Sequence, residues 1–174
     1  MRRTLVMRLV AALSGLLAAC DDGATVTRVD RMGGFSRSWI VSAAAGGGLP
    51  VEIHGAPFPG FTAEEAAAGL SFPPGTLHDV RFRLARPGEA PVNRLILVFN
   101  RADAPDAARD CRREDPPPTR AAAVDRFTAQ ATFCMGGRLQ ATGVLEARVE
   151  AGDREGYARA MRRLLREIAG DIVI

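Results

Sequence analysis

The stretch FTAQATFCMGGRLQATGVLEARV, residues 127–149, decides the fold class. Apolar and polar residues alternate over positions 127–135 and again over positions 139–149. A period of two is typical of strands that bury one face. Gly136 and Gly137 separate the two runs, and a glycine pair readily adopts the positive φ angles of a tight hairpin turn. The stretch therefore predicts a β-hairpin.

Further strands are expected before this hairpin. The run 94–101 encloses consecutive apolar residues, as in a central strand that is covered on both faces. Alternation of apolar and polar residues predicts strands at 51–54 and 80–84, and we interpret the segment 38–43 as the first strand. Residues 102–120 are charged and rich in proline, so we expect an irregular surface loop there.

Two helices are also expected. Thr62, followed three positions later by Glu65, forms a capping box, which predicts a short helix at 63–70. Asp153 can cap a longer helix over about 154–169, whose apolar side chains fall on one stripe. We interpret this stripe as packing on the sheet. Contact of a basic amphipathic helix with anionic lipid is the alternative.

Strands and helices do not alternate strictly along the chain, and no internal repeat is visible. The sequence therefore predicts an α+β domain rather than a repeated βαβ architecture. We expect an antiparallel sheet of about five to six strands, with the C-terminal amphipathic helix and the one short helix packed on it.

The first twenty residues carry the clearest signal for cellular location. A cationic start, with Arg2 and Arg3, precedes an uncharged run from Leu9 to Ala19. This run is too short to span a bilayer, which needs ~20 apolar residues. It ends in Leu17-Ala18-Ala19-Cys20, which resembles the lipobox of bacterial lipoprotein precursors. A core helix with one buried cysteine is the alternative, but the three features coincide at the N-terminus and favour the resemblance.

The resemblance implies how the chain is processed and where it is held. Residues 1–19 would be a signal peptide, and the Cys20 thiol would receive a diacylglyceryl group before a peptidase cuts the chain ahead of it. Membrane lipid is then a partner through the acyl anchor on Cys20. The protein is expected to be lipid-anchored in the bacterial cell envelope, with its domain on the periplasmic side. Asp21 and Asp22, directly after the lipidated cysteine, favour the inner membrane over the outer membrane.

The rest of the chain is expected to consist of a tether and one domain. Residues 21–35 show no clear periodicity, so the segment 20–35 is expected to be a lipidated tether. Residues 36–174 are expected to form a single α+β envelope domain, and the chain is long enough for one proper core.

The charge of the mature chain argues against a nucleic-acid partner. The full sequence has 23 basic and 20 acidic residues. Removal of residues 1–19 takes away three arginines and no acid, which leaves 20 of each sign. Proteins that bind nucleic acid normally present a basic surface. No nucleic-acid partner is therefore expected.

Cys111 and Cys134 remain as a pair once Cys20 is assigned to the anchor. In an oxidising envelope compartment a disulfide between them is expected, with a contribution on the order of 3 kcal/mol. Two free thiols or a metal site are the alternatives. A metal site would need more ligands nearby, and His54 and His78 are distant in sequence. No metal or cofactor is expected.

The candidate binding site is the loop Phe58-Pro59-Gly60-Phe61, together with Trp39. Aromatic rings held by prolines lose little entropy when they bind a partner, which suits recognition. The alternative is that Phe58 and Phe61 simply close one end of the sheet.

The sequence contains no recognised catalytic motif, and no catalytic residue is assigned. His54 and His78, the latter next to Asp79, are interpreted as structural rather than as metal ligands or proton carriers. We therefore predict a non-enzymatic envelope lipoprotein that acts as a binding or accessory domain, with an envelope protein as a possible partner. An envelope hydrolase with a site near His54 or His78 is the alternative.

Overall fold

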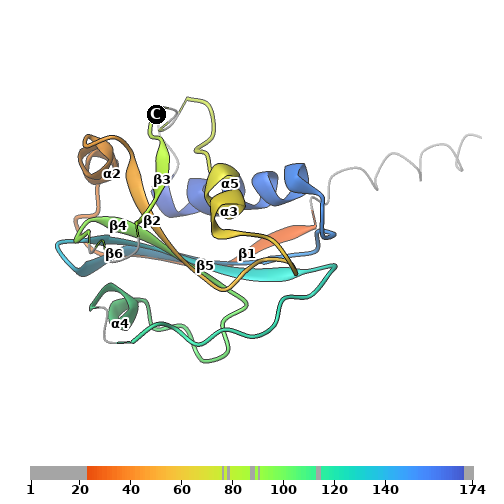
Figure 1. The fold of residues 1–174 in the computed structure, drawn as a ribbon. Helices are drawn as coiled ribbons and strands as arrows, with labels where there is room; N and C mark the ends of the chain where they lie inside the picture. The colour runs from red at the N-terminus through yellow and green to blue at the C-terminus, as the bar shows by residue number, and fades with distance from the viewer. Residues whose placement is uncertain are drawn as a thin grey trace, which may run out of the picture.

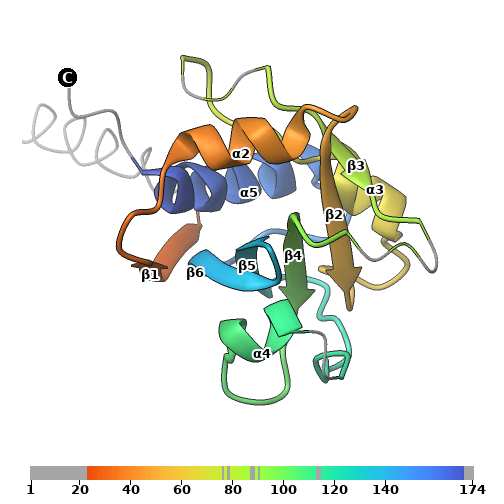
Figure 2. The same cartoon turned by 90° about the vertical axis from the view of Figure 1, so that its left-hand side faces the viewer.

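Six strands form one mixed sheet, and helices lie on both of its faces (Figures 1 and 2). The computed structural model describes residues 23–75, 77, 79–86, 89, 91–112 and 115–170. The strands are β1 (Ala24–Arg31), β2 (Leu49–His54), β3 (Phe82–Leu84), β4 (Arg94–Phe99), β5 (Phe127–Met135) and β6 (Arg138–Ala147). The helices are α2 (Arg37–Ala44), α3 (Ala63–Ala68), α4 (Ala107–Arg112) and α5 (Arg154–Ala169). The predicted α+β class is confirmed.

The predicted hairpin is β5 and β6, which pair antiparallel along their whole length. Gly136 and Gly137 form the turn with φ angles of 59° and 72°, which glycine adopts without strain. β4 pairs with the other edge of β5, and all six of its residues are buried, as expected for a central strand.

The sheet is not wholly antiparallel. Its strand order is β1-β6-β5-β4-β2-β3, and β2 runs parallel to both of its neighbours. The chain leaves β2, crosses through α3 and returns to form β3, and then passes to the other side of β2 to form β4. Connections that cross over in this way join parallel strands. The expected antiparallel sheet is thus correct for β1, β6, β5 and β4 only.

The main core lies between the sheet and the three helices α2, α3 and α5, which share one face (Figure 1). The apolar stripe of α5 is buried against the sheet, and this confirms the packing interpretation. β6 and α5 approach closely at Gly143, because a Cβ atom there would lie 2.9 Å from both Leu164 Cδ1 and Ile168 Cγ1. The Asp153 cap and the Thr62–Glu65 capping box are both present.

The segment 38–43, expected to be a strand, is helix α2. Ser36 begins the helix, because its side chain accepts a hydrogen bond from the Ser38 N–H at 3.3 Å. Ile40 is buried, and Ala43 and Ala44 pack on the core at helical spacing, whereas Val41 is exposed. A short apolar run fits either period, and here the helical one is adopted.

The tether expected over residues 20–35 is wrong from Ala24 onward, because β1 is a strand at the edge of the sheet and pairs with β6. The register of this pairing shifts between Val26 and Arg28. Such a β-bulge inserts an extra residue and breaks the alternation of side chains. The bulge explains why the sequence shows no clear period here, and the domain therefore includes β1, which lies before residue 36.

The loop expected over residues 102–120 contains the short helix α4, which covers the second face of the sheet (Figure 2). A smaller apolar cluster of Ile96, Val98, Cys111 and Cys134 lies beneath it. Within the described residues, none of the helices has the length and apolar character needed to cross a membrane.

Candidate functional site

The structure tests some of the predicted site residues and not others. Cys20, Asp21, Asp22 and His78 lie outside the described residues. The cysteine pair, the aromatic loop with Trp39, and His54 lie within them.

The aromatic loop closes one end of the sheet. Phe58 is 1% exposed, and its ring centroid lies 5.8 Å from that of Phe61 and 5.4 Å from that of Phe127. The Phe61 ring is half-buried and lies 5.1 Å from the ring of Tyr157. An exposed recognition loop is therefore the wrong interpretation for Phe58, and the alternative, in which both rings close the sheet, fits the packing.

Trp39 does not belong to this aromatic group. Its ring lies 6.4 Å from Phe35, and Phe35 lies 6.2 Å from Phe133. Phe133 is near the end of β5 and Phe127 at its start, so the two aromatic groups are at opposite ends of the strand. The structure does not bring Trp39 together with Phe58 and Phe61 in one site.

The Sγ atoms of Cys111 and Cys134 are 2.01 Å apart, which is the distance of a disulfide. Cys111 belongs to α4 and Cys134 to β5. The pair therefore attaches α4 to the second face of the sheet and holds it over β5 and β6.

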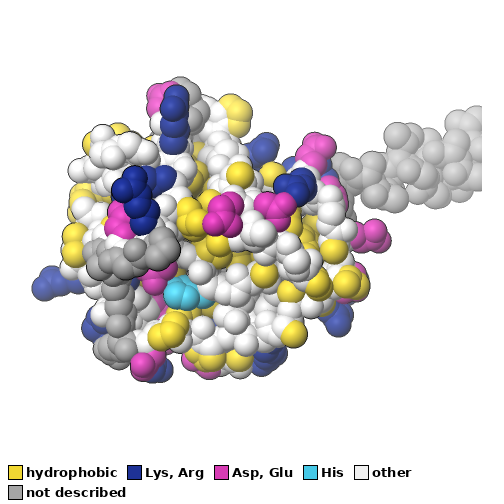
Figure 3. Space-filling view, in the orientation of Figure 1, with side chains coloured by type: hydrophobic (Ala, Val, Ile, Leu, Met, Phe, Trp, Pro, Cys, Tyr) yellow, Lys and Arg dark blue, Asp and Glu magenta, His cyan; other side chains and the backbone are white. Residues whose placement is uncertain are grey.

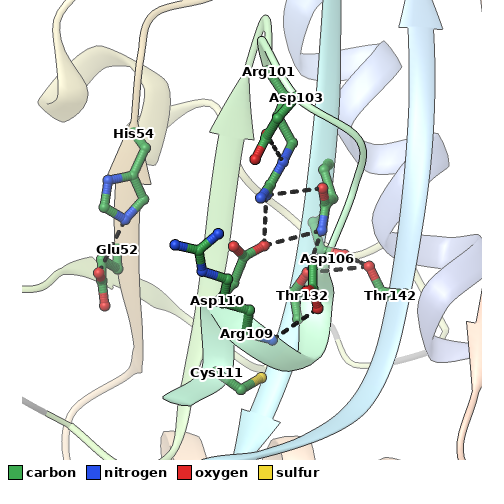
Figure 4. Close-up of polar contacts among 12 residues, drawn as sticks. Glu52, His54, Arg101, Asp103, Asp106, Arg109, Asp110, Cys111, Thr132 and Thr142 are labelled. Carbon is green, nitrogen blue, oxygen red and sulfur yellow. Dashed lines mark hydrogen bonds and ion pairs between the residues drawn. The ribbon is translucent and has the colours of Figure 1, made fainter. Parts of the chain in front are cut away.

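A chain of buried polar side chains lies on the same face (Figure 4). We call it the polar layer, and it consists of Arg101, Asp110, Gln130, Thr132 and Thr142. Arg101 Nη1 donates to Asp110 Oδ2 at 2.7 Å and to Gln130 Oε1 at 3.3 Å. Gln130 Nε2 donates to Asp110 Oδ2 and to Thr132 Oγ1, both at 3.2 Å, and the hydroxyls of Thr132 and Thr142 are 3.1 Å apart.

The positive charge of Arg101 and the negative charges of its carboxylate partners help to hold the polar layer together. Burial lowers the pKa of Arg101, but hydrogen bonds from its guanidinium to Asp110 and Asp103 outweigh this effect and raise the pKa above its usual value. The guanidinium therefore stays ionised. Because its members satisfy one another, the layer fixes α4 in place.

A pocket of about 240 Å³ opens beside the polar layer. It is lined by Glu52, His54, Glu89, Ile96, Asp110, Asp115, Pro116 and Pro117. His54 Nε2 lies 3.0 Å from Glu52 Oε1, and the second oxygen of that carboxylate lies 2.9 Å from Arg94 Nε. Glu52 and His54 are two positions apart on β2, so their side chains share one face of the strand. That spacing is the signal by which Glu52 could have been found from the sequence.

The pocket is acidic, and each of the four carboxylates that line it is paired with an arginine, including Glu52 with Arg94 and Asp115 with Arg109. Two hydrogen bonds from Arg83, and one from the Arg86 N–H, lower the pKa of Glu89 to about 2. Asp110 is paired with Arg101. Among the described lining residues none carries a hydroxyl or a thiol, so a nucleophile of the serine or cysteine type is missing from that set. His54, oriented by Glu52, is an imidazole among these carboxylates, and both types of side chain serve as general bases in enzymes.

The described residues contain no cluster of three side chains placed to hold a metal ion. Comparison with models of known protein families gave no match, and neither did comparisons with curated proteins or with solved structures.

Proposed function

We propose that the protein is a lipid-anchored domain of the bacterial cell envelope that binds or assists a partner and does not itself catalyse a reaction. The observation that carries this proposal is the position of β1 relative to Cys20. β1 begins at Ala24, four positions after the lipobox cysteine. A fully extended chain of that length spans at most roughly 14 Å. An acyl group on Cys20 would therefore hold the domain directly at the membrane surface.

The cysteine pair supports an envelope location. Disulfides persist in the periplasm and are rare in the reducing cytoplasm. The separation of Cys111 and Cys134 is that of a disulfide, and it joins two elements that the polar layer also connects. We infer that the two thiols are oxidised to each other after export.

The distribution of charge supports a protein or lipid partner over a nucleic acid. Figure 3 shows acidic and basic side chains interspersed on the face that it presents. Nucleic-acid binding would favour a continuous basic surface. A partner held in the same membrane, within reach of a domain on so short a link, fits the proposal best.

Metabolic labelling with a fatty-acid analogue tests the proposal. The wild-type chain is expected to incorporate the label, and Cys20→Ser is expected to lose it and to remain unprocessed. Cys111→Ser, a matched control at another cysteine, is expected to keep the label. Equal labelling of the wild type and Cys20→Ser would refute the lipid anchor.

Membrane fractionation tests the location within the envelope. Asp21 and Asp22 favour the inner membrane, so the wild type is expected in that fraction and the variant Asp21→Ser/Asp22→Ser in the outer-membrane fraction. Pull-down of the tagged lipidated protein from its own membranes then tests for an envelope partner.

The contact between His54 and Glu52 favours a second candidate, an envelope hydrolase. In that case His54 would act as a general base on a water molecule in the pocket, with Glu52 fixing the orientation of the ring. Assays with model esters, phosphate monoesters and glycosides test it. Hydrolysis that is lost in His54→Gln, with the melting temperature unchanged, would support the enzyme. Absence of turnover, or equal turnover in the variant, would exclude this candidate.

A further inference from the structure

A cleft of about 550 Å³ lies at the end of the sheet where β1 begins. Four of its lining residues are arginines, namely Arg101, Arg120, Arg126 and Arg148, and Glu146 is the one acid among the described lining residues. The mature chain as a whole would carry no net charge. The cleft therefore concentrates positive charge locally.

The arginines differ in how far they are engaged. Arg101 is paired within the polar layer, and Arg120 donates to the Ala102 carbonyl oxygen at 3.0 Å. The Arg126 side chain is largely exposed and lies 4.0 Å from Asp125, which is a loose pair. Arg148 is also exposed. Arg126 and Arg148 are thus the two cations with the most freedom to bind an anion.

The position of the cleft relative to Cys20 indicates which anion it meets. Gly23 lines the cleft, and its carbonyl oxygen accepts a hydrogen bond from the Arg148 N–H at 2.6 Å. Cys20 is three positions before Gly23, so an extended chain places it at most roughly 11 Å away. That reach is enough to cross the headgroup region on one side of a bilayer, which is roughly 5–8 Å deep.

A short apolar segment borders the same cleft. Residues 121–124 read Ala-Ala-Ala-Val and lie between Arg120 and Arg126. Val124 is 64% exposed, and its carbonyl oxygen accepts a hydrogen bond from the Ala151 N–H at 2.6 Å, which holds the loop beside the turn that precedes α5. An exposed apolar side chain between arginines suits a membrane interface, where the apolar group enters the acyl boundary and the guanidinium groups stay at the phosphates.

We propose that the cleft binds the phosphate of an anionic phospholipid headgroup through Arg126 and Arg148, with Val124 inserted beside it. Anionic lipids attract basic side chains within a Debye length of the surface. The acyl chain on Cys20 would hold the protein on the membrane, and the cleft would fix which side of the domain faces it. This inference rests on the proposed lipid anchor.

Tryptophan quenching in vesicles tests the proposal. The lipidated mature protein carrying Val124→Trp is reconstituted into vesicles of brominated phosphatidylcholine, with or without phosphatidylglycerol. Trp39, the one native tryptophan, gives a constant background. Quenching at position 124 is expected to be greater with phosphatidylglycerol present. Each arginine replaced is expected to weaken the interaction about fivefold, the usual effect of one basic residue near an anionic surface.

Two double variants of equal charge separate a local effect from a general one. Arg126→Gln/Arg148→Gln is expected to lose the additional quenching. The control Arg81→Gln/Arg138→Gln removes two exposed arginines near the opposite end of the sheet. This control variant is expected to keep the additional quenching. Hydrogen exchange of residues 120–126 in the protein without the tryptophan substitution gives a second measurement, with slower exchange expected on anionic vesicles.

The outcomes are distinguishable. Absence of an acyl group on Cys20 by mass spectrometry would overturn the anchor and this inference together. If the protein is acylated but its quenching and hydrogen exchange are the same on neutral and anionic vesicles, the headgroup site would be wrong and the lipid anchor would stand. If inorganic phosphate then raised the melting temperature of the wild type in detergent, and not that of Arg126→Gln/Arg148→Gln, the cleft would bind a free anion instead of a headgroup.

Discussion

Arg101 and Asp110 form an ion pair of 2.7 Å in which the side chains are only 6% and 2% exposed. Removal of one partner of a buried pair leaves an uncompensated charge, which costs about 3–5 kcal/mol. Asp110→Ala is therefore expected to lower the free energy of unfolding in urea by about that amount. The control is Asp115→Ala, whose exposed pair with Arg109 should contribute about 0–1 kcal/mol. Equal losses in the two variants would contradict a structural role for the polar layer.

The cysteine pair gives a second prediction. Peptides of the non-reduced protein from the envelope are expected to show Cys111 joined to Cys134 by mass spectrometry. Cys111→Ser/Cys134→Ser is expected to lose about 3 kcal/mol of stability, the value for a loop of this length. Two free thiols in the envelope protein would show that the pair is not oxidised there.

The contact of α5 with β6 at Gly143 leaves no room for a methyl group. Gly143→Ala is expected to destabilise the protein by about 1–3 kcal/mol, the usual cost of overpacking a core. Gly46→Ala is the matched control, because no atom lies within 4 Å of a Cβ built there. A thermal melt of both variants checks the difference, and a neutral Gly143→Ala would mean that the helix can shift away from the sheet.

Phe58 is expected to behave as a core residue. Phe58→Ala should cost about 3–5 kcal/mol in denaturant unfolding, because it leaves a cavity among the surrounding rings. Val41→Ala, at an exposed position of α2, should have little effect. If Phe58→Ala kept full stability but lost a co-purifying partner, the interpretation of this loop as a recognition element would be supported and the core role of Phe58 would be wrong.

The acidic pocket gives a prediction of pH dependence. The pKa of Glu89 is about 2 in the folded protein because Arg83 stabilises the carboxylate, and an unfolded glutamate has a value near 4.5. Since the folded pKa is the lower one, the stabilisation is complete above pH 4.5 and is lost as the pH falls toward 2. NMR titration of the Glu89 carboxyl carbon checks the value. Arg83→Gln is expected to move the pKa up toward 4.5.

The sequence predicts the parts of this fold that depend on local patterns. The alternation around Gly136–Gly137 specifies the hairpin, and the caps at Thr62 and Asp153 specify where α3 and α5 begin. The β-bulge after Val26 hides β1, because it interrupts the period on which strand prediction depends. The parallel pairing of β2 follows from contacts between distant segments, and no local pattern encodes it.

The features of the candidate site also divide into those that the sequence predicts and those that depend on contacts between distant segments. Cys111 and Cys134 could be paired from the sequence, because two cysteines remained after one was assigned to the anchor. The polar layer could not be predicted, since its side chains come from β5, β6, α4 and the segment after β4, and they meet only after the sheet has formed. The burial of Phe58 also depends on Phe127, which lies far along the chain.

The pairing of β1 with β6 sets the order in which the chain can assemble. Thr27 bonds Val144 across 117 positions, and Arg163 bonds the Ala24 carbonyl oxygen across 139 positions. A ribosome releases the residues of β1 first and those of β6 and α5 last. The backbone groups of β1 that β6 satisfies therefore stay unpaired until β6 has been made. Any truncation before residue 147 removes residues of β6 that pair with β1, so the strand made first can complete its edge of the sheet only after β6 is present.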